Sequence, residues 1–516
     1  MYPAYSVNTA MEAHQFAVTD IAEIGMRRPG AGVLWGLRHS LPTTEQLLVS
    51  GGDARIALTH NSLANSLGSG LANQYGCPPT PDPALFALGS STASVISVAG
   101  HAAAERLRSR LLLAIQMEPA ARVYARELAR QRVELATLCG VDSMPGLDIA
   151  IGASGTDLHL IAAQYCASQT QAPLLTITVN ASETGSGVPA ALAAARADTT
   201  VSVALRLPDG SLRPSVDVDA VIEDLTVAAV AAGKRVLLVA VDVSKSGLIA
   251  PSVAAIVALK RRFADSLDVL IDACQFRLAP ATLRAYLDLG CMVALTGSKF
   301  VTGPAFSGAL LLPAGLRGST QCVDSPVAWR VSVDDNVNFG LLLRWEAALH
   351  ELREFRAVPE AQATAFLTCF AAAVGERLAG DALFEVLPVA PLDRAALAVA
   401  GAWDAIQTIF SFVPHHPETR GGGALSVDET SRLYHALFHA QFHAQFHTEG
   451  ASELRCQFGQ PVACGHRQGS PISALRLCAS ARLVVEATSG DNAIGVINRT
   501  LAALGKTAAL LRSGAY

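Results

Sequence analysis

The stretch RVLLVAVDV (235–243), PSVAAIVALKRRFA (251–264) and DVLIDA (268–273) decides the fold class. The first and third runs are short and mainly apolar, which is typical of β-strands buried on both faces. The run between them has the spacing of an amphipathic helix. A strand, a helix and a second strand in this order predict two parallel strands joined by a crossover helix.

The same alternation extends along the middle of the chain. Further strands are expected at LDIAIGAS (147–154), LLTITVN (174–180), VALRLP (203–208), CMVALTGS (291–298) and FSGALLLP (306–313), with helices over 102–139 and 156–168. We therefore predict an α/β fold of three layers, with a mostly parallel sheet covered by helices on both faces. In such sheets function resides at the carboxyl ends of the strands.

Composition excludes several classes of protein. The 516 residues are 51% hydrophobic and 16% charged, so the chain is not intrinsically disordered. The net charge of -5, from 39 basic and 44 acidic residues, gives no reason to expect nucleic acid or an anionic membrane as a partner. Residues 225–243 are apolar enough to suggest a membrane span, but Lys234 and Arg235 lie in their middle. We interpret them as a helix end followed by a buried strand.

Segment composition suggests the domain organisation and the location. Residues 1–100 are rich in Gly, Ser, Asn and Pro and should be mostly loops, 101–340 a large domain, and 355–516 a small α+β domain. Residues 1–16 show no basic start followed by an apolar core, so no secretory signal is expected. Ten cysteines without CxxC spacing indicate reduced thiols. We expect a cytoplasmic protein.

Polar residues follow several of the predicted strands. Ser154, Gly155 and Thr156 come after a strand and open a helix, where free N–H groups and hydroxyls can bind an anion. The same residues could be an ordinary helix N-cap. Asp272 ends another strand and Gln275 follows it, although a strand-end aspartate could also cap the next helix.

Two basic residues complete this set. Lys299 lies just beyond an apolar strand, among the small residues Thr296, Ser298 and Gly303, as if something must approach closely. Apolar surroundings lower the pKa of a lysine and make its amine nucleophilic, although a surface position is also open. Arg476 offers donors that match a carboxylate, or it could form a surface salt bridge.

In this order, the features resemble the fold-type I pyridoxal-phosphate (PLP) enzymes, closest to the branch of class V aminotransferases and cysteine desulfurases. The resemblance covers residues 145–315 well and the C-terminal part loosely. Its specific part is the pair VLIDACQ (269–275) and TGSKFVTGP (296–304).

The resemblance implies roles for the central residues. Lys299 would hold PLP as a Schiff base and later move the proton at the substrate Cα. Asp272 would pair with the pyridine nitrogen and keep it protonated, and Gln275 would bind the ring oxygen.

It also implies which residues hold the phosphate and the substrate. Phosphate donors would be Ser154, Gly155, Thr156 and Thr296, and Ser298 would also contact the cofactor. Arg476 would bind the substrate carboxylate. The N-terminal Arg55, Asn73 and Tyr75 could contact substrate, or belong to an ordinary packed loop.

Two departures from the family pattern weaken a desulfurase assignment. The segment after strand 174–180 has no aromatic ring to stack on the cofactor, so Glu183 or Thr184 would occupy that place, or His60 or Tyr75 would supply a ring. Ser298 stands where desulfurases commonly have histidine. We do not expect Cys322 to carry a persulfide.

A histidine stripe stands apart from these features. His435, His439, His443 and His447 recur every four residues, so adjacent pairs could bind a metal on one helix face. Phenylalanines recur in step, and we favour a helix packed through them, with no metal.

The sequence thus predicts a PLP-dependent homodimer that acts on an amino acid or amine. Transamination and Cα/Cβ lyase chemistry are favoured, decarboxylation is the alternative, and a non-catalytic binding relative is a further one. No nucleic acid or membrane partner is expected.

Overall fold

The computed structural model describes residues 41–49, 72–73, 76–90, 93–195, 199–314, 337–438 and 454–516. Residues Pro42–Tyr516 form one compact unit, to which the description below refers. The predictions on Arg55, His60, Tyr75, Cys322, His439, His443 and His447 lie outside the described residues.

A large mixed sheet forms the centre of this unit. Its strand order is β2 (Asp148–Gly152), β9 (Gly308–Leu312), β8 (Met292–Thr296), β7 (Leu267–Asp272), β5 (Arg235–Asp242), β3 (Leu174–Val179) and β4 (Thr199–Val203), with β6 (Ile249–Ala250) paired to β5. Only β9 and β6 run antiparallel to their neighbours. The carboxyl ends of β2, β8, β7, β5 and β3 therefore meet at one edge, and the predicted fold class is confirmed.

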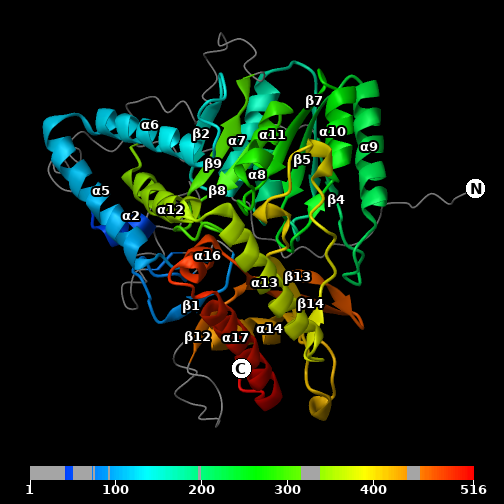
Figure 1. Ribbon diagram of the computed structural model, residues 1–516. Coiled ribbons are helices and arrows are strands. Elements are labelled where there is room, and N and C mark those ends of the chain that lie inside the picture. The colour runs from blue at the N-terminus through cyan, green and yellow to red at the C-terminus, as the bar shows by residue number, and fades with distance from the viewer. Residues whose placement is uncertain are drawn as a thin grey trace, which may run out of the picture. The chain divides into compact units, whose positions relative to one another are not determined.

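Helices cover both faces of the sheet, because its central strands are apolar on both sides. Val236, Leu238 and Ala240 of β5 share a core with α9 (Ser215–Ala231), α10 (Val253–Arg262) and α11 (Pro280–Asp288). The alternate residues Leu237 and Val239 share a second core with α7 (Gly155–Ser168) and α8 (Val188–Ala194). Figure 1 shows α9 and α10 side by side along the sheet. The run 225–243 is a helix end and a buried strand, as predicted.

Two predicted elements are wrong in their bounds. The strand expected at 203–208 is β4 at Thr199–Val203, because the chain then turns at Pro208 and Gly210. The single helix expected over 102–139 is α5 (Val98–Met117) and α6 (Ala120–Leu138). Pro119 separates them, since the residue before a proline is disfavoured in helical conformation.

The C-terminal part combines a small antiparallel sheet with helices. Helices α12 (Phe339–Ala357) and α13 (Glu360–Ala379) lead to strands ordered β10 (Phe384–Val386), β11 (Ile409–Pro414), β14 (Ser470–Cys478) and β13 (Gly459–Arg467). Helices α14 (Val427–Phe438), α16 (Ala481–Thr488) and α17 (Ala493–Ser513) accompany them. Near the start of the described chain, α2 (Thr44–Val49) precedes β1 (Leu85–Ala87), which pairs in parallel with β12 (Arg455–Gln457). The domain boundaries stay a prediction.

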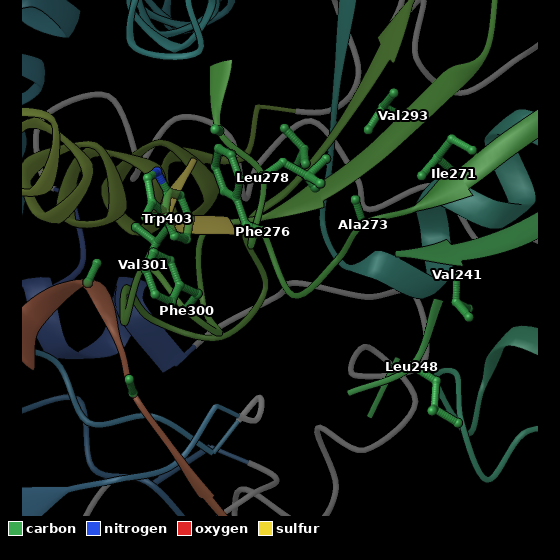
Figure 2. Packing of buried hydrophobic residues seen from close by; sticks show 14 of the residues in the cluster. Val241, Leu248, Ile271, Ala273, Phe276, Leu278, Val293, Phe300, Val301 and Trp403 are labelled. Atoms are coloured by element: carbon green, nitrogen blue, oxygen red, sulfur yellow. The ribbon is translucent and has the colours of Figure 1, made fainter. Parts of the chain in front are cut away.

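An aromatic cluster fixes the segment after β8. The Phe300 ring stacks on Trp403 with centroids 5.1 Å apart, and Phe355 meets both rings edge-on. The Arg277 guanidinium lies 4.9 Å from the Phe300 centroid. Figure 2 shows Phe276, Phe300 and Trp403 gathered in this cluster. The residue directly after Lys299 is therefore anchored in the core.

Membrane-spanning potential is weak in the part of the chain that the structure describes. No single helix there is long and apolar enough to cross a bilayer. Helices α12 and α13, bent by 97°, meet the length and composition criteria only as a pair.

Candidate active site

A cavity of about 770 Å³ opens at the carboxyl edge of the large sheet. Strands β13 and β14 of the small sheet close its other side with Gln460, Pro461, Val462 and Arg476. A volume of this size suits a small-molecule site. The structure brings most of the predicted residues into its lining: Ser154, Gly155, Thr156, Asp272, Gln275, Thr296, Ser298, Lys299 and Arg476.

The cradle is the loop between β2 and α7, residues 154–156, which lines the cavity and is predicted from the sequence to bind an anion. Ser154 is the N-cap of α7, and its hydroxyl accepts a bond from the Asp157 amide at 3.3 Å. A Cβ on Gly155 would come within 3.0 Å of Cys274 Sγ, so glycine lets the backbone lie close to the cavity wall. The capping and anion-binding interpretations are thus compatible, because the same residues line the cavity.

Asp272, at the end of β7, carries a negative charge. Its Oδ2 accepts a bond from Thr184 Oγ1 at 2.7 Å and lies 3.3 Å from His159 Nε2. Burial alone would raise the pKa of Asp272, but His159, Lys299 and the Thr184 hydroxyl hold it well below its usual range. Thr184 therefore acts through Asp272, and it is not among the residues that line the cavity.

His159 is a buried partner of Asp272 that the sequence did not identify in this role. Its Nδ1 lies 2.7 Å from the Gly155 carbonyl, which can only accept, so Nδ1 carries a proton. Burial would lower the pKa of His159, but Asp272 and the Gly155 carbonyl raise it above its usual value. His159 brings an aromatic ring into the cavity from α7. The available signal was its place one helical turn after Gly155.

Gln275 is oriented by a residue from far away in the chain. Ser90 Oγ donates to Gln275 Oε1 at 2.7 Å, and both side chains are buried. With Oε1 satisfied in this way, the amide nitrogen of Gln275 is left to donate. Ser90 also lines the cavity, and no local sequence pattern marks it.

The Lys299 loop is held tightly against α12. A Cβ on Gly297 or Gly303 would come within 2.6 Å of Ala348 Cβ, so the small residues serve close packing of a helix. The close approach expected from these small residues is therefore made, at Gly303, by helix α12. Thr296 donates its hydroxyl to the Cys274 carbonyl at 2.6 Å and not towards the cradle.

Arg476 is buried and takes part in no salt bridge within the described chain. Its Nε and Nη2 donate to the Gln460 carbonyl at 3.2 and 2.9 Å, and Nη1 lies 3.4 Å from the Lys245 carbonyl oxygen. Burial lowers the pKa of Arg476. The surface salt-bridge alternative is therefore wrong.

Lys245 is a second lysine in the cavity, and the sequence interpretation missed it. It follows β5 as Lys299 follows β8, so the strand-end signal was present. Its Nζ donates to the Ala181 carbonyl at 2.9 Å. Burial, helped by Arg476 and Lys299, lowers the pKa of Lys245 to about 8.

Two predicted residues lie elsewhere. Glu183 does not line the cavity, because its carboxylate accepts bonds from Arg206, Ser244 and Ser246. Asn73 lines a separate cavity of about 20 Å³ and accepts a bond from the Cys77 amide. Of the histidine stripe, only His435 is described, and the described residues contain no group of three metal-ligating side chains.

A solved structure with a TM-score above 0.5 shares this fold. A lysine-to-alanine mutant of C-DES, with glycine covalently linked to its PLP cofactor, is 17% identical, with 82% of this chain and 99% of that chain covered and a TM-score of 0.52. Oryza sativa TDC with PLP is 17% identical (94% and 92% covered, TM-score 0.48), as is mouse CSAD in apo form (90% and 91%, TM-score 0.46). No protein-family model and no curated protein matches the chain.

Proposed function

We propose that this chain is a PLP-dependent enzyme acting on an amino acid. The observation that carries the proposal is the charge of Asp272, which His159 and Thr184 maintain in the same cavity as Lys299. The fold shared with the PLP-linked C-DES structure supports it.

The donor set of the cavity fits PLP. An ionised, buried carboxylate suits a protonated pyridine nitrogen, and the start of α7 suits a phosphate. Gln275 presents a donor suited to the ring oxygen, because Ser90 occupies its Oε1. Lys299 supplies the amine that holds the cofactor.

When bound, PLP supplies an electron sink for negative charge that develops at the substrate Cα. The residues of the chain do the rest. Asp272 would hold a protonated ring nitrogen, Lys299 would move the proton at Cα, and Arg476 would bind the substrate carboxylate and so fix which Cα bond breaks.

Transamination or Cα/Cβ lyase chemistry is the reaction that we favour, because both begin with proton transfer at Cα by Lys299. Decarboxylation would use the same groups. Incubating the holoenzyme with single amino acids and following keto acid, ammonia and CO₂ separates the three. Release of CO₂ would instead indicate that the enzyme is a decarboxylase.

The cofactor itself is tested by the visible absorbance of protein purified with PLP. We expect a band from lysine-bound cofactor that Lys299→Ala loses. The matched control is Lys260→Met: Lys260 also donates to a carbonyl, that of Leu267 at 3.1 Å, but it does not line the cavity. A protein that takes up no cofactor would refute the proposal.

A cytoplasmic homodimer is part of the same proposal. The family resemblance supports the dimer, and the cysteine spacing and the N-terminal sequence support the location. Sedimentation velocity should give the mass of two chains, and a monomer that turns over substrate would contradict it.

A further inference from the structure

Resting on the proposed function, we infer that Lys245 and Arg476 form a two-cation subsite that selects amino acids carrying a second carboxylate. In this arrangement Arg476 binds the carboxylate at Cα and Lys245 binds the distal one. The inference depends on where the two cations lie and on which charges remain unmatched.

Lys245 points to the side of the cavity away from the anion cradle. Its Nζ donates to the carbonyl of Ala181, which follows β3, and two of its three N–H groups remain for a ligand. In the sheet, β3 is the neighbour of β5 on the side opposite to β7. Lys245 therefore leans away from β2 and its cradle.

The start of α7 lies against the end of β7. A Cβ on Gly155 would come within 3.0 Å of Cys274 Sγ, just after β7, and His159 of α7 lies 3.3 Å from Asp272. Strand β7 is the direct neighbour of β5, which precedes Lys245, so distance alone does not separate Lys245 from a phosphate bound there. The bond of Lys245 towards β3 favours the other side of the cavity, and the cofactor band of Lys245→Met distinguishes the two roles.

Arg476 reaches the same side from the small sheet. Its Nη1 lies 3.4 Å from the Lys245 carbonyl oxygen, so the two cationic residues are adjacent. The guanidinium of Arg476 has five N–H donors, and three of them point to backbone carbonyls. Two donors therefore remain for a carboxylate.

The charges in the cavity leave this side positive. Among the described residues of the lining, Asp272 is the one carboxylate, and His159 lies against it at 3.3 Å. Glu183, behind the lining, is matched by Arg206. Three cationic side chains remain in the lining, and Lys299 is the one assigned to the cofactor. Two carboxylates of an acidic amino acid would match the other two, Lys245 and Arg476.

The titration of Lys245 agrees with this geometry. Burial lowers its pKa to about 8, and the positive charges of Arg476 and Lys299 add to the effect. Burial removes water from the Lys245 ammonium group, and no carboxylate bonds to it. An anionic ligand would therefore stabilise its charge.

The test is calorimetric titration of the holoenzyme with glutarate, a dicarboxylate, and with butyrate, a monocarboxylate of similar size. Neither has an amino group, so binding is measured without turnover. We expect Lys245→Met to weaken glutarate binding about tenfold or more and to leave butyrate binding unchanged. Lys245→Arg should retain the preference, and the control Lys260→Met should change neither affinity.

Each other outcome overturns the inference. Equal weakening of glutarate and butyrate would mean that both cations bind one carboxylate. Loss of the cofactor band in Lys245→Met, with the band kept in Lys245→Arg, would make Lys245 a cofactor ligand. Unchanged affinities for both ligands would leave Lys245 without a role in selection. Failure of the proposed function is distinguishable, because the wild-type protein would then show no cofactor band at all.

Discussion

Asp242 and Asp272 end the neighbouring strands β5 and β7, and both carboxylates are buried. In the sequence the two look alike, each closing an apolar run. Asp242 pairs with the guanidinium of Arg394, which binds both carboxylate oxygens, and accepts the Tyr286 hydroxyl at 2.8 Å. Asp272 pairs with His159 and Thr184 and lines the cavity that contains Lys299.

The difference lies in the partner of each carboxylate. Arginine cannot lose its proton in a protein, so Asp242 and Arg394 form a permanent buried ion pair. Histidine can lose its proton, so the charge beside Asp272 is adjustable. A permanent pair suits packing, whereas an adjustable one suits a site where charge moves during a reaction.

The largest expected effect breaks the structural pair. Asp242→Asn leaves Arg394 charged and buried without a carboxylate, and should lower the free energy of unfolding by about 3–5 kcal/mol. Turnover per folded molecule should stay unchanged. Denaturant titration measures the first quantity, and a loss below about 1 kcal/mol would contradict the interpretation of Asp242.

Asp272→Asn should have the opposite profile. Turnover of the holoenzyme should fall by about 10²- to 10³-fold, as when a preorganised electrostatic partner is removed. Stability should fall less than for Asp242→Asn, because His159 can release its proton. Steady-state kinetics at saturating PLP, with denaturant titration beside them, test this. Unchanged turnover would place Asp272 with the structural carboxylates.

Single hydroxyl deletions sharpen the comparison. A hydrogen bond to a charged group contributes about 1.5–3 kcal/mol. Thr184→Val removes the hydroxyl from Asp272 and should lower turnover about tenfold or more. Tyr286→Phe removes the hydroxyl from Asp242 and should lower stability only. Steady-state kinetics and denaturant titration test both variants. Reduced turnover in Tyr286→Phe, with a loss of stability alone in Thr184→Val, would contradict the comparison.

The smallest effect is a pH dependence of substrate selection. Lys245, with a pKa of about 8, is charged below that pH and loses its charge above it, so glutarate affinity should fall up to about tenfold per pH unit above 8. The charged groups around it are Arg476, Lys299, Asp272 and Glu183. Calorimetry between pH 6.5 and about 9.5 tests the trend. The glutarate affinity of Lys245→Arg should change little over this pH range. A similar fall of affinity in that variant would mean that another group titrates.

Much of the fold was predictable because short, continuous apolar runs mark strands buried on both faces. The errors have local causes. Pro119 breaks a helix, and Pro208 ends the apolar run after β4 in a turn. Pairings such as β1 with β12 join distant segments, and no local pattern specifies them.

The candidate site was predictable where its residues directly follow strands, as Asp272, Gln275 and Lys299 do. Lys245 carries the same signal and was overlooked. Ser90 could not be found, because it reaches Gln275 from 185 positions away. Glu183 was misplaced, since its partners Arg206, Ser244 and Ser246 come from later segments that bring it out of the cavity lining.

The central claim is that Lys299 binds the cofactor, and Lys245 is the competing lysine in the same cavity. The most direct measurement is borohydride reduction of the PLP-loaded protein, followed by mass spectrometry of its peptides. We predict that the cofactor is fixed to the peptide containing Lys299. A modification on Lys245, or none on either lysine, would contradict the claim.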